Sequence, residues 1–241
     1  MKSNENDGFL DFILKHFEKG ILCNKNLLMF SKLIVNKSFL VGELFVLSML
    51  VPGGIFFFKL APYILLFLWF ILVYTLFVYW CLGSDKSYAV TFNFKTLFLV
   101  LGRWAFASVV LLFMTHQLFP EKLFMIQANN PGLIWKILLF YPLFSALPQE
   151  FIFCKFFFRR YRCLFGDGTL MVTISAVAFC LAHILFLNWV APVLGFVAGI
   201  IFANTYRRTH SLAMVTLEHS LYGNAIFVMG LGWFFWGGSI N

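Results

Sequence analysis

The stretch IWKILLFYPLFSALPQEFIFCKFFF, residues 134–158, decides the fold because it is long, apolar and interrupted near its middle by two adjacent polar residues. An α-helix needs about 20 apolar residues to cross a hydrocarbon layer about 30 Å thick, and this stretch is long enough. An ionisable side chain near the centre of such a layer costs roughly 2.5–3.5 kcal/mol. It therefore normally faces the interior of the helical bundle and has a function there. Gln149 and Glu150 therefore mark a membrane helix that carries a function.

The whole chain has the composition of a membrane protein. Its 241 residues are 61% hydrophobic and 12% charged, they include 34 Phe, and the mean hydropathy is +0.88. Such values lie far outside ordinary soluble domains, and the alternating pattern of a transmembrane barrel is missing. We therefore expect an all-α, polytopic transmembrane helical bundle. The apolar windows predict seven spans, at residues 39–58, 60–82, 96–118, 133–158, 170–188, 190–206 and 211–232.

The N-terminal segment, residues 1–38, has a different pattern. It contains both charges and lacks the apolar core and small-residue cleavage site of a signal peptide. Apolar residues recur at helical spacing opposite charged ones, which predicts an amphipathic helix at the membrane surface. The apolar positions are Phe9, Ile13, Phe17 and Ile21, and the charged ones are Asp11, Lys15 and Lys19.

Basic residues alternate between the two sides of the predicted bundle. Short cytoplasmic loops accumulate Lys and Arg, so a cytoplasmic N-terminus and an external C-terminus are predicted. The basic segments are residues 1–38, the loop with Lys86 and Lys95, the loop with Arg159, Arg160 and Arg162, and the loop with Arg207 and Arg208. Because these loops are short, any function lies within the bilayer or at its edges, and the arginine loop indicates contact with lipid rather than nucleic acid.

Three ionisable side chains lie at membrane depth on separate predicted spans. With a rise of 1.5 Å per residue, Glu150 lies about 13 Å and His219 about 12 Å inside the cytoplasmic boundary, whereas His183 lies about 20 Å inside. A carboxylate and two imidazoles can activate a water molecule and protonate a leaving group. They can equally bind a metal ion with an open coordination position, and the sequence does not choose between the two.

Three short motifs give the chain a resemblance to a known family. They are QEFIFC with FRRY after it (residues 149–161), AFCLAH (178–183) and LEHSLYGN (217–224). In order, spacing and placement on separate spans they resemble the CPBP family of intramembrane proteases, which includes the CAAX prenyl endopeptidases. The resemblance covers about residues 133–235. It implies a four-helix catalytic core at 133–241 and leaves the three spans at 39–132 without a motif, while the charge pattern makes 1–38 a cytoplasmic amphipathic segment.

The resemblance also implies roles for particular residues. One glutamate of a pair polarises the attacking water in this family, so Gln149 and Glu150 are candidates here. His183 is expected to assist the water, and His219 with a nearby asparagine, Asn224, is expected to stabilise the tetrahedral oxyanion.

Two motifs depart from the family pattern. Gln149 stands where the first glutamate is expected, and Cys154 stands where an arginine is expected, so we consider Arg103 on the third span as a replacement cation. In the last motif Gly223 stands at the usual Asn or Asp position, and Asn224 follows it. A local bulge at Gly223 would bring Asn224 back toward His219.

The expected function is therefore an intramembrane endopeptidase that cleaves a membrane-anchored, lipidated or C-terminally tailed protein, in a bacterial inner membrane. Its chemistry is either of the glutamic type or zinc-dependent, with zinc at His183, His219 and Glu150. The lipid bilayer and a membrane protein substrate are the expected partners, and nucleic acid is not. The departures at Gln149 and Cys154 leave open an inactive relative that binds or protects a partner. A proton-coupled transporter ranks last, because no internal repeat is visible.

Overall fold

The structure, a computed structural model, describes residues 36–83, 90–91 and 93–235. The amphipathic helix predicted around Phe9 to Ile21 and the loop residue Lys86 lie outside these ranges. The chain forms two compact units, residues 1–44 and 45–241, and the second unit contains every described element that comes after α3. Within the described ranges the regular structure is entirely helical, which confirms the predicted all-α class.

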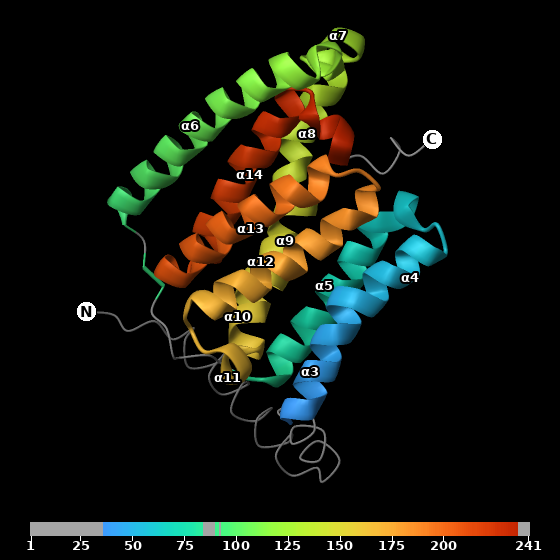
Figure 1. The fold of residues 1–241 in the computed structure, drawn as a ribbon. Coiled ribbons are helices and arrows are strands. Elements are labelled where there is room, and N and C mark those ends of the chain that lie inside the picture. The colour runs from blue at the N-terminus through green and yellow to red at the C-terminus, as the bar shows by residue number, and fades with distance from the viewer. Residues whose placement is uncertain (1–35, 84–89, 92, 236–241) are drawn as a thin grey trace, which may run out of the picture. The chain divides into compact units, whose positions relative to one another are not determined.

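Twelve α-helices are interspersed with short π-helical and 3₁₀ segments in the described part of the chain (Figure 1). The α-helices are α3 (Lys37–Phe45), α4 (Val51–Phe57), α5 (Ile64–Cys81), α6 (Phe94–Leu118), α7 (Met125–Asn129), α8 (Pro131–Tyr141), α9 (Leu147–Glu150), α10 (Phe157–Arg160), α11 (Arg162–Phe165), α12 (Thr169–His183), α13 (Val190–Thr209) and α14 (Leu212–Val228). The π-helical segments are η1 (Val46–Leu50), η4 (Pro142–Ala146) and η5 (Phe151–Phe156), and the 3₁₀ segments are η2 (Ala61–Tyr63), η3 (Pro120–Lys122), η6 (Ile184–Phe186) and η7 (Leu231–Phe235).

Six helical stretches of the described chain are long and apolar enough to cross a membrane: 37–57, 61–81, 94–118, 131–160, 169–186 and 190–209. They correspond to the first six predicted spans. The seventh predicted span, 211–232, corresponds to α14, which has 17 residues and ends at Val228, about 25 Å after its start. It ends there because Gly230 has a positive φ of 90°, which turns the chain into η7.

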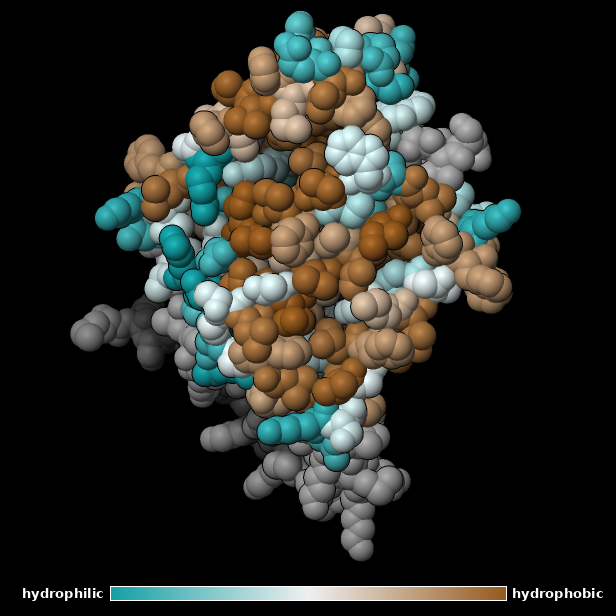
Figure 2. All heavy atoms as spheres, viewed as in Figure 1, coloured by the Kyte–Doolittle hydropathy of each residue, from teal (hydrophilic) through white to brown (hydrophobic). Residues whose placement is uncertain are grey.

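Figure 2 shows the apolar side chains spread over one face, with hydrophilic ones toward its margins.

Two glycines allow α12 and α13 to pack closely. A Cβ at Gly199 would lie 3.0 Å from the Cα of Ala176, and a Cβ at Gly195 would lie 3.0 Å from Cγ of His183. Small residues four apart let membrane helices approach through their backbones. Next to this pair lies α14, and α6 runs along α14 (Figure 1). The close packing holds His183 against α13.

Residues 131–160 form one continuous helix that includes α8, α9 and α10. Two π-helical segments, η4 and η5, lie on either side of the four residues of α9. The N–H of Leu147 donates to the carbonyl of Pro142, five residues back, as in a π-turn. Each wide turn contains an additional residue, so the faces that Gln149 and Glu150 present differ from those of an ideal α-helix. Such segments often occur at functional sites.

Two prolines in this helix leave carbonyl groups without their usual donors. Pro142 has no N–H, so it cannot bond to the carbonyl of Leu138, and Asn224 Nδ2 donates to that oxygen instead at 3.3 Å. In the same way Pro148 leaves the carbonyl of Phe144 free for Trp69 Nε1, at 3.2 Å. Side chains of α14 and α5 therefore satisfy backbone groups of the central helix, as a membrane helix requires.

The described basic connections lie at one end of the bundle. Arg159 Nη2 donates to the carbonyls of Leu82 and Gly83, at 2.8 and 2.7 Å, and so joins the end of the central helix to the end of α5. The N–H of Thr91 donates to the carbonyl of Thr209 at 2.9 Å, which joins the segment before α6 to the end of α13. All four helix ends lie toward the same end in Figure 1. This agrees with the predicted alternation of basic loops, and the assignment of this end to the cytoplasm stays a prediction.

Candidate active site

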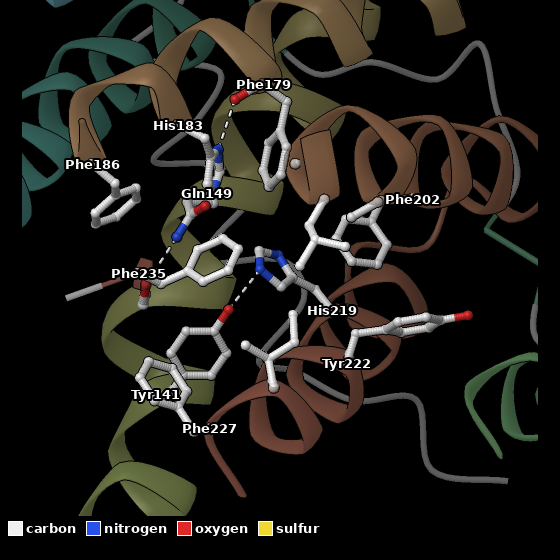
Figure 3. Close-up of a pocket in the computed structure, with 16 residues that line it drawn as sticks. Tyr141, Gln149, Phe179, His183, Phe186, Phe202, His219, Tyr222, Phe227 and Phe235 are labelled. Carbon is white, nitrogen blue, oxygen red and sulfur yellow. Dashed lines mark hydrogen bonds between the residues drawn. The ribbon is translucent and has the colours of Figure 1, made fainter. Parts of the chain in front are cut away.

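A pocket of about 620 Å³, with the open space at its mouth included, lies between the central helix and helices α12, α13 and α14 (Figure 3). Five phenylalanines line it: Phe179, Phe186, Phe202, Phe227 and Phe235. The polar side chains that line the pocket include Tyr141, Ser145, Gln149, His183 and His219. The pocket therefore combines aromatic side chains with a small group of hydrogen-bonding residues.

A buried carboxylate and an imidazole meet beside this pocket. Glu150 Oε1 lies 2.7 Å from Nδ1 of His219, and the two residues are 1% and 5% exposed. The contact agrees with the matching depths predicted for these residues. An ionised carboxylate only accepts hydrogen bonds, so Nδ1 of His219 carries the proton and Nε2 of the neutral ring carries the lone pair. The Phe202 ring stacks on the imidazole at 4.6 Å and holds its plane.

His183 is held by its own helix and by α13. Its Nδ1 donates to the carbonyl of Phe179 at 2.7 Å. A carbonyl only accepts, so in the neutral ring Nε2 is again the atom with the lone pair. The Phe179 ring contacts both histidines, with centroid distances of 4.5 Å to His183 and 5.7 Å to His219. The two imidazoles thus line one pocket from separate helices.

Gln149 and Glu150 have different positions relative to the pocket. Gln149 lines it, and its Nε2 donates to Ser145 Oγ at 2.8 Å. Glu150 lies behind His219 and is not among the lining residues. We expected Glu150 itself to face the attacking water, whereas the structure brings it to the pocket only through the imidazole of His219. The residue at the pocket surface is a carboxamide, which cannot accept a proton at ordinary pH.

Residues 131–235 match the family model described as type II CAAX prenyl endopeptidase, Rce1-like. The match confirms, over this part of the chain, the resemblance that the three motifs predicted. No curated protein and no solved structure matches the chain. At the level of the family, the match supports a membrane-embedded protease. All residues named for the pocket lie within this Rce1-like segment.

Asn224 does not reach the pocket of the Rce1-like segment. Its amide group donates to the carbonyl of Leu138, and the residue is not among those that line the pocket. The expectation that it acts beside His219 therefore differs from the structure. The group that does contact Nε2 of His219 is the hydroxyl of Tyr141, at 2.8 Å.

Arg103 does not compensate Glu150, contrary to our expectation. Its Nη2 lies 2.8 Å from Oε1 of Glu218 and donates to Thr205 Oγ1 at 2.9 Å. Glu218 is fully buried, so this pair joins α6 to α13 and α14. Among the described residues, the ion-pair partner of Glu150 is His219, and the second carboxylate oxygen of Glu150 has no hydrogen bond.

The expected zinc site does not fit the donor geometry. Both nitrogens of His219 are engaged, by Glu150 and Tyr141, and Nδ1 of His183 is engaged by a backbone carbonyl. Within the described ranges, no three His, Cys, Asp or Glu side chains converge as a metal site would require. The side chains around the pocket therefore do not form a ligand set for a zinc ion.

Tyr141 and Ser145 were not predicted as site residues. With Gln149 they form a series at intervals of four residues, and all three line the pocket. That spacing is visible in the sequence, but in an ideal α-helix each step of four residues turns the face by about 40°. The additional residue in the turn of η4 reduces this drift, and a hydropathy pattern does not reveal a π-turn.

Proposed function

We propose that the protein is an intramembrane endopeptidase that hydrolyses a peptide bond of a membrane-anchored or C-terminally tailed protein. The observation that carries the proposal is the hydrogen-bonded pair of Glu150 and His219 beside a pocket that His183 also lines. The match of the surrounding segment to a family of endopeptidases supports the same reaction class. A lipidated protein is a suitable substrate, because five phenylalanines line the pocket.

In this proposal the general base is His219, and Glu150 supports it. The water gives a proton to Nε2 of His219 as its oxygen bonds to the scissile carbonyl carbon. The negative charge of Glu150 stabilises the imidazolium that forms, and the proton then passes to the leaving amine as the C–N bond breaks. The buried position of the carboxylate strengthens this effect, since few other charges or waters screen it.

His183 has a positioning role toward the water. Its Nε2 lone pair can accept a hydrogen bond from the water that attacks, while its Nδ1 is fixed on the Phe179 carbonyl. With one O–H directed at Nε2 of His219 and the other at Nε2 of His183, the lone pairs of the water oxygen are left directed at the substrate.

The first prediction tests this reaction. Purified protein in proteoliposomes should cleave a membrane-anchored substrate that carries a C-terminal tail, and His183→Ala should lower kcat at least 100-fold, because the water loses a partner. The matched control is His116→Ala, since His116 is exposed at the end of α6, away from the pocket. Mass spectrometry of the products locates the cleaved bond.

Equal cleavage by wild type and His183→Ala would contradict the assignment. A second candidate, a non-hydrolytic protein that binds or protects a partner, is favoured by one observation: the pocket surface carries Gln149 rather than a carboxylate. In that case the tailed substrate would bind without cleavage, and the His183→Ala variant would change its affinity but not its integrity.

A further inference from the structure

A tyrosine hydroxyl contacts the proposed base directly. Tyr141 is the last residue of α8, and its hydroxyl oxygen lies 2.8 Å from Nε2 of His219. The ring packs edge-on against His219 and Phe227, with centroid distances of 5.8 and 5.4 Å, so the side chain is held in place. Tyr141 also lines the pocket, as Figure 3 shows.

The direction of this hydrogen bond follows from the other side of the imidazole. Nδ1 of His219 donates to the Glu150 carboxylate, so Nε2 of the neutral ring carries no proton. The Tyr141 hydroxyl must therefore donate to Nε2. The resting site holds a chain of two hydrogen bonds, from Tyr141 to His219 and from His219 to Glu150.

From this geometry we infer that Tyr141 supplies the hydrogen bond that stabilises the oxyanion, an inference that rests on the proposed endopeptidase function. Nε2 of His219 has one lone pair, so the Tyr141 O–H must leave it when the attacking water binds there and gives up its proton. The tyrosine O–H is then free to turn to the substrate oxygen, which gains negative charge as the water oxygen bonds to the carbonyl carbon. Tyr141 keeps its proton throughout, and the imidazolium N–H can donate to the phenolic oxygen.

The packing on α14 is adapted to this tyrosine. A Cβ at Gly223 would lie 2.2 Å from Cε1 of Tyr141 and 2.4 Å from its hydroxyl oxygen. Real Cβ atoms do not come so close, so no other residue at this position leaves room for the tyrosine ring. Because residue 223 has no side chain, α14 leaves a space beside His219, and the hydroxyl of Tyr141 occupies that space. Because Asn224 is engaged by the Leu138 carbonyl, it does not compete for this role.

Tyr141→Phe is the direct test, because it removes the hydroxyl and keeps the ring. Loss of one oxyanion donor should lower kcat roughly 100 to 1,000-fold, with KM within about threefold, since the ground-state carbonyl gains little from this donor. The control is Tyr79→Phe, in which the ring that contacts Phe151, Lys155 and Arg159 is retained far from the pocket. The thermal midpoints of both variants are measured alongside, to show that the bundle is intact.

Gly223→Ala provides a second, independent variant. It keeps the hydroxyl but displaces it, so kcat should fall by a similar factor, and in the Tyr141→Phe background it should cause no further hundredfold loss. Wild-type kcat in Tyr141→Phe, with His183→Ala inactive, would overturn the inference and leave the proposed function standing. If His183→Ala also kept full activity, the proposed function itself would fail. A Tyr141→Phe effect confined to KM would show a binding role and would likewise overturn the inference.

Discussion

At the residue scale, the carboxylate of Glu150 determines which ring nitrogen of His219 carries the proton. Glu150 is 1% exposed, one oxygen contacts His219, and the other has no hydrogen bond among the described residues. A buried charge of this kind is costly unless it is paired. Cys154, one turn further along, lies beside the carboxylate but carries no positive charge. The pair with His219 is therefore the contact that offsets the cost of burying this carboxylate.

The second prediction concerns this charge. Glu150→Gln keeps the size of the side chain and removes the charge, so the imidazolium loses its support and its tautomer is no longer fixed. The kcat should fall by about 10³ to 10⁴-fold, as for the comparable change in a catalytic triad. Steady-state cleavage in proteoliposomes measures it, and Glu121→Gln in the exposed η3 segment serves as control. A change smaller than tenfold would remove Glu150 from the proposed mechanism.

At the element scale, the central helix depends on its neighbours to complete its hydrogen bonds. Prolines at positions 142 and 148 free two carbonyls, and side chains of α14 and α5 bond to them. These contacts fix the position of the helix against the elements that carry His219 and Trp69. The resemblance made Asn224 a catalytic candidate. In the structure its side chain instead completes the hydrogen bonds of the central helix.

The third prediction separates these two roles of Asn224. Asn224→Ala should lower the free energy of unfolding by about 1–3 kcal/mol, because the Leu138 carbonyl is left without its partner. The kcat should fall less than tenfold. Pro142→Ala restores a backbone donor to that carbonyl, so the double variant should recover most of the lost stability. Unfolding in mixed micelles provides the measurement.

One result would contradict this structural role of Asn224. A loss of kcat above 100-fold in folded Asn224→Ala protein, without recovery in the double variant, would place Asn224 in the catalytic machinery. Asn204→Ala is a suitable control, since Asn204 donates within its own helix to the carbonyl of Ile200.

The positions of the helices could be predicted from the sequence because long apolar windows leave few alternatives in a membrane. The span predicted at 96–118 corresponds to α6 at Phe94–Leu118, and the one predicted at 170–188 corresponds to 169–186. The directions of the polar side chains could not be predicted in the same way. They depend on the π-turns of the central helix and on packing across helices, as at Gly223 and Tyr141, where the partners are 82 residues apart by the numbering.

At the scale of the whole molecule, the arrangement of basic ends predicts how the protein lies in its membrane. The described ends of α5, α10 and α13 and the start of α6 lie toward one end of the bundle (Figure 1), and they carry most of the described arginines. The positive-inside tendency assigns this end to the cytoplasm.

The fourth prediction tests this orientation with a thiol reagent that does not cross membranes. Cys163, exposed in α11, should react only in inverted vesicles. In a variant without other cysteines, a cysteine at position 121 in η3 should react only in intact cells, because η3 follows α6 at the opposite end. The reverse pattern would invert the topology, and reaction from both sides at one position would contradict a single orientation.

The two wide turns on either side of Gln149 and Glu150 also have a consequence for how such a site can change over time. A π-turn is equivalent to one residue inserted into an α-helix and tolerated where it stands. Removal of one residue from η4 would narrow this turn to an ordinary α-turn, and the helix on either side, Tyr141 and Glu150 included, would keep nearly the same relative direction. A family of chains with this helix could thus gain or lose one codon in the turn and exchange the residues of the turn itself, while the rest of the site keeps its arrangement.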